Sequence, residues 1–249
     1  MFFWQDVRYA LRLLAKNPVF TLLTVLVLGG GLGLSIFTFS FLHTAMLKPI
    51  PVPEGEGIVR LLTLANGRGG AVEAADLAAI RPSLTSLTEV GAYSVREYVI
   101  GTGEATRSIG ATESEWNIFE VTRTRPALGR GFHPDDQARG AEPVVVLTDW
   151  AWRVVFGGDS GVIDRRVPMN GVATRVIGVM PRGYGFPVAS EAWVPMSPEL
   201  LSPTAPAGRL VQAYARLSNG ANASRASGEL SGLLLRVREG RARSDPNLV

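Results

Sequence analysis

Cysteine is absent from this chain of 249 residues, and lysine and histidine are scarce. Without cysteine there can be no disulfide framework, no zinc site with cysteine ligands and no thiol nucleophile. The two histidines, His43 and His133, lie far apart in the sequence, which argues against a mononuclear zinc site. Neither lysine, Lys16 or Lys48, follows the glycine pattern of a P-loop, so the chain is not expected to hydrolyse ATP by that route.

Basic residues outnumber acidic ones, with a formal charge of +3 and a sequence pI of about 9.6. Of the 25 basic residues, all but two are arginines, and they are scattered along the chain. Nucleic-acid binding needs basic residues gathered in a patch or run, often beside aromatic side chains. The pattern therefore predicts a solvated basic surface and no nucleic-acid partner.

A long apolar run, residues 19–47, contains no Asp, Glu, Lys or Arg, and His43 is its one ionisable residue. A bilayer core of about 30 Å needs about 20 apolar residues in helix, so this run predicts a transmembrane helix. A cleaved signal peptide is the alternative. Its apolar region would be shorter and would precede an A-x-A-like site, which favours the uncleaved anchor.

Two features of the N-terminal region predict how it meets the membrane. Residues 1–18 have the spacing of a short amphipathic interfacial helix ended by Pro18, with Arg8, Arg12 and Lys16 placed towards lipid headgroups. The excess of basic residues before the span predicts a cytoplasmic N-terminus and a main domain outside the cytoplasm, at the plasma (inner) membrane. Residues 48–57 form a proline-rich linker.

Within the predicted span, Gly29 and Gly33 form a G-x-x-x-G pair. Small residues at this spacing allow two transmembrane helices to approach closely. A run of glycines also makes a helix more flexible. The pair is therefore compatible either with helix–helix packing or with local flexibility alone. The glycines do not predict a dinucleotide-binding loop, because no strand precedes them.

The remainder, residues 58–249, has short strand and helix patterns without strict alternation, which predicts an α+β domain. We expect a helix that begins at Thr148 or Asp149 and ends at Gly157, and a hairpin at Asn170-Gly171, the strongest turn signal in the chain. Gly183–Pro187 is expected to be a loop. The other expected strands are 58–64, 93–100, 107–111, 143–148 and 210–217, and the other helices are 74–80 and 223–239.

Candidate catalytic groups are few. Residues 158–161 read Gly-Asp-Ser-Gly, the surroundings of a serine nucleophile in one protease fold. That mechanism needs a histidine base oriented by an acid, and only His133 lies outside the apolar run. A polar turn after a helix is therefore the favoured interpretation, with an anchored hydrolase using Ser160 and His133 as the weakest alternative.

The other chemistry-bearing residues are interpreted structurally. The pairs Asp135-Asp136 and Glu113/Glu115 lack the spacing of a calcium loop and are expected to be surface acids. Trp150, Trp152 and Trp193 are expected in the core rather than on a ligand platform. No metal, cofactor or catalytic residue is predicted.

Several motifs together resemble MacB/FtsX-type ABC transporter permeases, in particular the acidobacterial-type permeases that lack their own ATPase domain. The N-terminal motif runs from Asp6 to Arg12 and from Lys16 to Thr21, before the glycine-rich span. Motifs similar to a MacB-like periplasmic core domain follow at 128–132, 144–152, 156–159, 176–181, 186–187, 193–195, 215–217 and 224–230.

The chain departs from the family pattern at two places. Asp164 stands where the family usually has glycine in its V-I-G-R run. The family's three later transmembrane helices find no counterpart after Leu47, so we expect a truncated permease, a fragment or a degenerate gene product.

The resemblance implies the N-terminal part of an ABC permease that couples cytoplasmic ATPase motion to an extracytoplasmic domain. The implied partners are a separate ABC ATPase subunit, a second permease copy if a full-length form exists, and membrane lipids. It also implies a porter-like module, 58–110 and 203–249, with an inserted β-rich subdomain at 111–202. The alternative function is a single-pass, membrane-anchored periplasmic interaction module without transport activity.

Overall fold

The computed structural model describes residues 8, 16–42, 52, 55–65, 68–101, 106–202, 205–206 and 208–244. The chain divides into two compact units, Met1–Pro49 and Ile50–Val249, which are treated separately below. The interfacial helix predicted for residues 1–18, most of the linker 48–57 and the last five residues of the predicted span fall outside the described residues.

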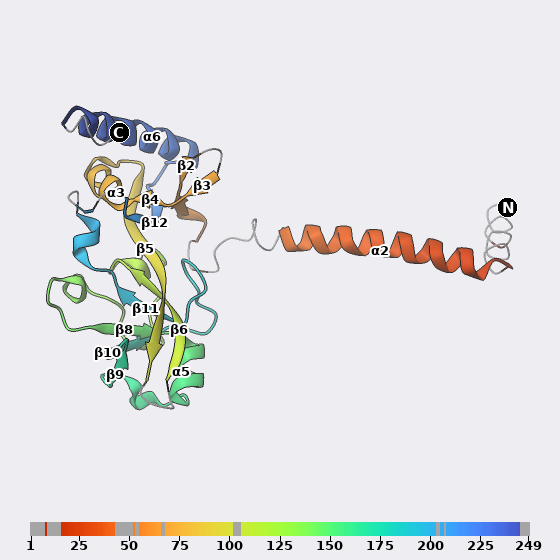
Figure 1. The fold of residues 1–249 in the computed structure, drawn as a ribbon, viewed down its shortest axis with the longest axis horizontal. Helices are drawn as coiled ribbons and strands as arrows, with labels where there is room; N and C mark the ends of the chain where they lie inside the picture. Colours follow the sequence, from red (N-terminus) through yellow and green to blue (C-terminus); the bar gives the residue numbers. More distant parts are fainter. Residues whose placement is uncertain are drawn as a thin grey trace. The chain divides into compact units, whose positions relative to one another are not determined.

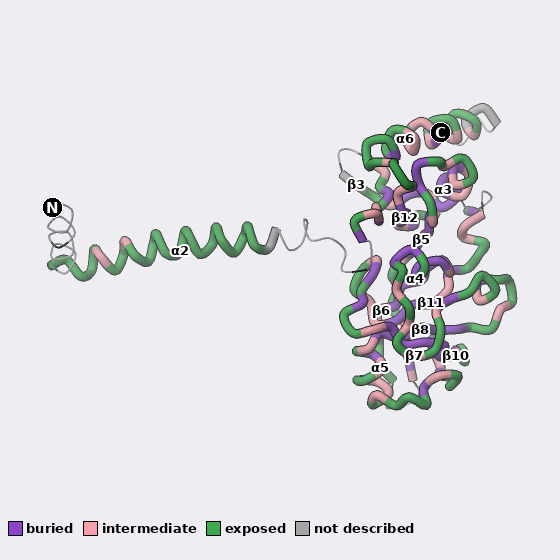
Figure 2. Tube along the Cα trace, turned by 180° about the vertical axis from the view of Figure 1, so that it is seen from behind, coloured by how far each residue is buried: buried purple, intermediate pink, exposed green. Residues whose placement is uncertain are grey.

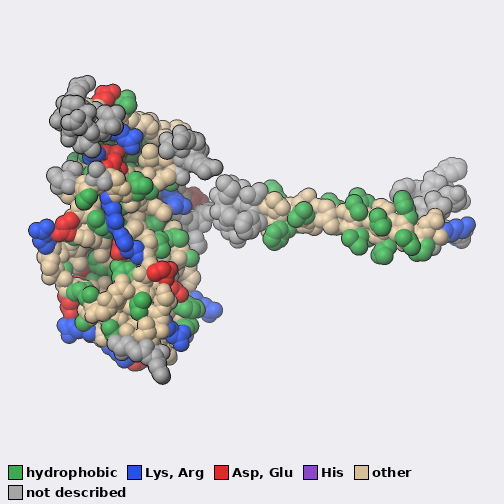
Figure 3. Space-filling model, in the orientation of Figure 1, with side chains coloured by type: hydrophobic (Ala, Val, Ile, Leu, Met, Phe, Trp, Pro, Cys, Tyr) green, Lys and Arg blue, Asp and Glu red, His purple; other side chains and the backbone are tan. Residues whose placement is uncertain are grey.

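The first unit is dominated by α2, Pro18–Leu42 (Figure 1). Asn17 interrupts helical structure before it, as expected for the residue that precedes a proline. The hydroxyls of Thr21 and Thr24 donate to the carbonyls of Asn17 and Phe20, at 3.0 and 2.9 Å. These bonds satisfy two of the hydroxyls in this largely apolar helix, which also contains Ser35, Thr38 and Ser40. Its described side chains are mostly exposed, and hydrophobic side chains cover it (Figures 2 and 3).

The second unit is an α+β domain, which confirms the predicted class. Its α-helices are α3 (Ala74–Ile80), α4 (Ile118–Val121), α5 (Asp149–Phe156) and α6 (Ala223–Ser244). Its short 3₁₀ helices are η2 (Gly55–Gly57), η3 (Arg81–Ser83), η5 (Pro134–Gln137), η6 (Ser160–Val162) and η7 (Pro198–Leu201).

The domain is organised on one ten-stranded mixed sheet with a separate β2–β3 hairpin. The strand order is β1-β12-β5-β6-β11-β8-β10-β7, with β4 paired to β12 and β9 paired to β10 and β5. The strands are β1 (Ile58–Leu61), β2 (Thr63–Ala65), β3 (Arg68–Gly70), β4 (Val72–Glu73), β5 (Leu87–Ile100), β6 (Arg107–Ser114), β7 (Leu128–Gly129), β8 (Val144–Leu147), β9 (Arg166–Met169), β10 (Val172–Val179), β11 (Ala192–Pro195) and β12 (Leu210–Leu217).

The core consists of three apolar clusters strung along this sheet. One cluster, rich in alanine and leucine, packs α3 against β1, β5 and β12. A second is aromatic, with Phe119 and Tyr184 packed around the fully buried Trp193 at centroid distances of 5.8 and 5.2 Å. The third joins β8, β10 and β11 to α5. The 14-residue strand β5 contributes to all three, so it ties the domain together along its length.

Local sequence signals are confirmed where they were strongest. The Thr148 hydroxyl caps α5 by accepting a hydrogen bond from the Ala151 amide at 3.0 Å, and Gly157 ends the helix with φ 65°. Asn170 and Gly171 form the turn between β9 and β10, with φ of 50° and 79°. Both conformations are left-handed, which is why these residue types mark them.

Several element boundaries differ from those predicted. The expected strand 58–64 is interrupted at Leu62, which is 55% exposed, so β1 joins the main sheet while β2 joins the hairpin. β5 begins at Leu87 rather than residue 93, because Gly91 lets the strand pass beneath the ring of Tyr214, a contact that no local pattern reveals. β6 continues to Ser114 and α6 to Ser244.

Candidate functional site

Helix α2 carries two of the predicted site residues. By length and composition, Pro18–Ser40 could cross a membrane, with a mean hydropathy of 2.2. Added Cβ atoms at Gly29 and Gly33 would meet nothing within 4 Å, so no other described element lies against the pair, and its role in helix packing stays a prediction. Lys16 and Arg8 are exposed, whereas Arg12 lies outside the described residues.

Ser160 and His133 each take part in a local turn, and the contacts of the described residues do not bring them together. Asp159 caps η6 by accepting from the Gly161 amide at 2.8 Å. His133 caps η5, and its Nδ1 accepts from the Asp135 amide at 3.4 Å. A serine nucleophile needs a histidine base within hydrogen-bond reach, which these contacts do not provide.

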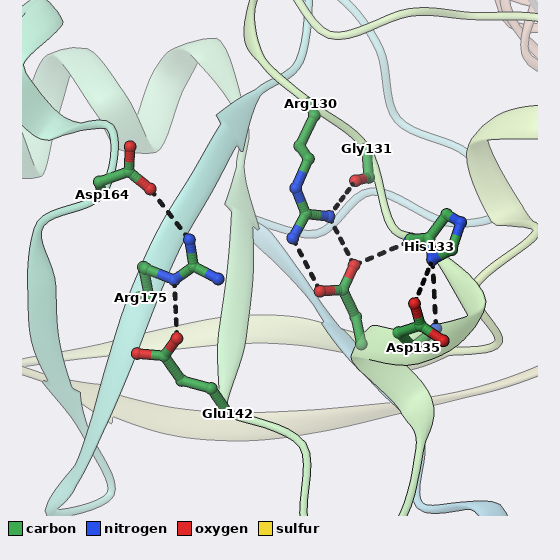
Figure 4. Close-up of polar contacts among 8 residues, drawn as sticks. Arg130, Gly131, His133, Asp135, Glu142, Asp164 and Arg175 are labelled. Atoms are coloured by element: carbon green, nitrogen blue, oxygen red, sulfur yellow. Dashed lines mark hydrogen bonds and ion pairs between the residues drawn. The ribbon is translucent and has the colours of Figure 1, made fainter.

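The predicted surface pair Asp135-Asp136 divides into two different environments (Figure 4). Asp135 is exposed beside His133. Asp136 accepts two hydrogen bonds from Arg130, at 2.6 and 2.8 Å, and one from the His133 amide at 2.7 Å. Burial raises the pKa of Asp136, but these donors outweigh it and hold the pKa below its ordinary value. The carboxylate thus fastens the loop around η5.

In the same region, Arg175 forms ion pairs with both Glu142 and Asp164 (Figure 4). The guanidinium lies 3.0 Å from Glu142 and 3.1 Å from Asp164. Asp164 has φ 63°, a left-handed conformation that favours glycine. This conformation would give a physical reason for the glycine that the resemblance implies at that position.

The prediction that Glu113 and Glu115 are surface acids is wrong, most clearly for Glu115. That residue is 5% exposed and accepts from both terminal nitrogens of Arg81 and from the Ala92 amide. Glu113 accepts from Ser94, Arg96 and Tyr98 at 2.8–3.0 Å. Each carboxylate finds its donors on neighbouring elements. Pairing across the sheet, which sequence spacing does not encode, decides their environment.

Further buried polar groups surround Glu115. The hydroxyl of Tyr214, fully buried, donates to Asn117 at 2.9 Å, and burial raises the pKa of Tyr214 well above 10. Arg216 donates to the carbonyl of Val121 and lies 3.5 Å from Glu89. Together with Arg81–Glu115 these residues form a polar junction between the α3 cluster and the aromatic cluster. Breaking such buried pairs is costly, so the junction holds the two parts of the sheet in fixed register.

Helix α6 is attached to the rest of the domain at two carboxylates. Glu229 accepts from the backbone and hydroxyl groups of both Thr85 and Ser86. Side-chain hydrogen bonds from Ser86 and Thr85 lower the pKa of Glu229 to about 2. Asp76 of α3, which is fully buried, accepts from Arg238 at 3.1 Å and from Arg241 at 2.6 Å. These contacts are called the α6 fastenings below.

Trp150 differs from its prediction as a core residue. Its side chain is 52% exposed on α5, beside a groove of about 650 Å³ that Val154 and Tyr184 also line. Trp193 is fully buried as predicted, and its indole N–H donates to the Phe186 carbonyl at 2.9 Å.

Among the described residues, no group of three or more His, Asp or Glu side chains could hold a metal ion.

Comparison with known proteins identifies the family. The sequence model of the MacB-like periplasmic core domain matches residues 21–233, most of the chain. The chain belongs to this family. It is the MacB-like periplasmic domain of an ABC-type transporter permease, with one N-terminal apolar helix long enough to span a membrane. No curated protein matches the sequence.

Solved structures share the fold at low sequence identity. The periplasmic region of MacB from Actinobacillus actinomycetemcomitans is 19% identical with a TM-score of 0.55, covering 72% of this chain and 83% of that structure. The extracellular domain of the ABC-type transporter YknZ from Gram-positive bacteria is 17% identical with a TM-score of 0.54, covering 73% and 95%.

Proposed function

We propose that this chain is the first membrane helix and extracytoplasmic domain of an ABC permease, and that it couples cytoplasmic ATPase motion to that domain for export or mechanotransmission. The observation that carries the proposal is the single family match, which begins inside α2 and continues through the domain. The permease would act with a separate ABC ATPase subunit and a second permease copy. No residue performs catalysis in this role.

A coupling domain must move as a stiff body, and the described residues support that requirement. β5 pairs with β6 over eight residues and with β12 over most of its other half. The polar junction and the α6 fastenings add long-range ion pairs between elements. Packed strands would therefore transmit a force from one end of this sheet to the other, rather than loop motion absorbing it.

We propose the domain layout implied by the family. The porter-like module would comprise residues 58–110 and 203–249, and the inserted β-rich subdomain residues 111–202. The first part includes α3 and α6, and the second includes α5. β6 crosses the boundary, which would make this strand the main link between the two parts.

We also propose an orientation, with the N-terminus in the cytoplasm and the domain outside. Arg8, Arg12 and Lys16 would contact lipid headgroups, and Gly29 and Gly33 would contact another transmembrane helix. Because the chain has no cysteine, single-cysteine variants test this directly. In intact cells a membrane-impermeant maleimide should label Arg225→Cys and leave Gln5→Cys unlabelled until the cells are lysed. Labelling of Gln5→Cys alone would overturn the orientation.

The partner proposal is tested by cross-linking the tagged full chain in membranes of its own host. We expect an ABC ATPase subunit and a further permease chain to co-purify. The double variant Gly29→Leu/Gly33→Leu should reduce the permease cross-link, while Gly30→Leu/Gly31→Leu serves as a matched control. Recovery of a discrete extracytoplasmic partner without an ATPase would instead favour the single-pass interaction module.

A further inference from the structure

A pocket of about 310 Å³ lies between α6 and the sheet, and it is called the α6 pocket here. Its walls are mainly apolar. The sheet and α3 contribute Val59, Leu61, Val72, Leu77 and Ile80, while α6 contributes Ala226, Leu230 and Leu234. Figure 1 shows α6 and α3 lying together at one end of the domain.

The pocket exists because α6 presents small side chains to it. Ala223, Ala226, Ser227 and Ser231 all line the pocket from the helix. Of the described α6 residues, only Ala226 and Leu233 are buried. The α6 fastenings, at Asp76 and Glu229, hold the helix by polar contacts that do not depend on closing the space. The helix is therefore positioned without being tightly packed.

A space of this size and composition has a definite chemical preference. Protein interiors contain few voids larger than a water molecule, and a water molecule needs two to four polar partners. Apolar cavities of about 150 Å³ stay dry and bind small apolar molecules. The α6 pocket is larger and lies at the lower end of the range of ligand sites, about 300–1,000 Å³.

One polar atom in the pocket lacks a partner. The hydroxyl oxygen of Thr63 is buried and finds no hydrogen-bond partner among the described residues. An unsatisfied buried hydroxyl is unfavourable, and a ligand with a hydrogen-bonding group would remove that cost. The site thus offers an apolar body and the Thr63 hydroxyl as a donor, with Arg60, Ser227 and Ser231 also in its lining.

We propose that the α6 pocket binds one acyl chain of a membrane lipid, whose ester or head-group oxygen accepts a hydrogen bond from Thr63. Only residues 43–58 separate the end of α2 from Val59, the first residue that lines the pocket. A chain anchored through α2 is held beside a bilayer, where acyl chains are the most concentrated apolar molecules. This inference rests on membrane anchoring and does not depend on coupling to an ATPase.

The first test measures thermal unfolding of the full chain in a lipid-free amphipathic polymer with added decanol, because the acyl chains of a lipid environment would already occupy the pocket. The wild type should gain about 5–10 °C at a decanol concentration about 100-fold above Kd. Ser231→Leu fills the pocket and should lose this gain, whereas Ser224→Leu, the same change on α6 outside the pocket, should keep it. Ser227→Leu provides a second filled variant if Ser231→Leu does not fold. Equal gains in the filled and control variants would overturn the proposal, as would no gain in the wild type.

The second test examines the polar contact. Thr63→Val should bind decane as the wild type does but bind decanol about tenfold more weakly, because only decanol uses the hydroxyl. Equal weakening of both probes would show a general disturbance of the pocket and would contradict the assigned role of Thr63.

The third test identifies the source of the chain. Nanodiscs containing tail-nitroxide phosphatidylcholine should quench a fluorophore on Ala223→Cys at the pocket, and Ser231→Leu should remove most of the quenching. Decanol binding without lipid quenching would overturn the assignment to a membrane lipid, because the pocket would then take a free amphiphile.

Discussion

Helices α5 and α6 lie in one domain but are specified in different ways. α5 is defined by neighbours in sequence, since Thr148 caps its start and Gly157 ends it. α6 is held by partners far away along the chain, since Asp76 lies 162 residues from Arg238 and Thr85 lies 144 residues from Glu229. A local mutation should therefore affect α5 through its own ends and α6 through its attachments.

This difference follows from the residues that each helix buries. α5 packs Ala151 and the side chains around it against the Val-rich β8 cluster. α6 has few buried apolar residues, so its position depends more on charge and hydrogen bonds. Removing one partner of such a contact is costly, because the other group stays buried without its hydrogen bond or opposite charge.

The largest effect is expected from removing both arginines that contact Asp76. The double variant Arg238→Gln/Arg241→Gln leaves a fully buried carboxylate without its charged partners. We expect a loss of about 3 kcal/mol in the free energy of unfolding, measured by denaturant titration. The matched pair Arg225→Gln/Arg236→Gln, on exposed positions of the same helix, should change stability by less than about 0.5 kcal/mol. Equal losses of stability in the two double variants would show that the total charge on α6, rather than the contact with Asp76, determines the free energy of unfolding.

Glu229→Gln should have the next largest effect and a distinctive pH dependence. The pKa of Glu229 falls from 4.5 to about 2 through hydrogen bonds from Ser86 and Thr85. Because the folded pKa is the lower one, the stabilisation is complete above about pH 4.5 and is lost as the pH falls towards 2.

Urea titrations at pH 7, 5, 4 and 3 check this prediction. At pH 7 the wild type should exceed Glu229→Gln by about 1–2 kcal/mol, and the gap should narrow at pH 4 and again at pH 3. The exposed Glu120→Gln serves as the control. A gap that stays constant between pH 7 and pH 3 would refute the role given to the Glu229 carboxylate.

For α5 the corresponding change is Thr148→Ala, which removes the cap. A loss of about 1 kcal/mol is typical for this substitution. Thr148→Ser keeps the hydroxyl that accepts from Ala151 and should recover most of the stability. If serine were no better than alanine, the methyl group rather than the cap would explain the loss.

The smallest effect is expected at Asp164. Asp164→Gly relieves the left-handed conformation but loses the exposed contact with Arg175, so the two changes should nearly cancel, within about 0.5 kcal/mol. Asp164→Val, which is β-branched, should cost about 1–2 kcal/mol more than glycine in thermal or urea unfolding. Equal stability of the two variants would remove the conformational argument.

The sequence alone determined the features that depend on near neighbours. The apolar run predicted α2, Thr148 and Gly157 bounded α5, and Asn170-Gly171 marked the hairpin. The α+β class and the family resemblance followed from such signals repeated in order. These interactions span only a few residues, so their pattern is visible in one dimension.

Tertiary structure decided which groups are buried and with what they pair. Only folding shows that Glu115 meets Arg81 in the interior, that Trp150 is exposed, and that Gly91 passes beneath Tyr214. It also leaves the α6 pocket open, because Asp76, Thr85 and Ser86 hold the helix from positions more than 140 residues away. Contacts between such distant residues arise from strand pairing and packing, and the spacing of residues along the chain does not predict them.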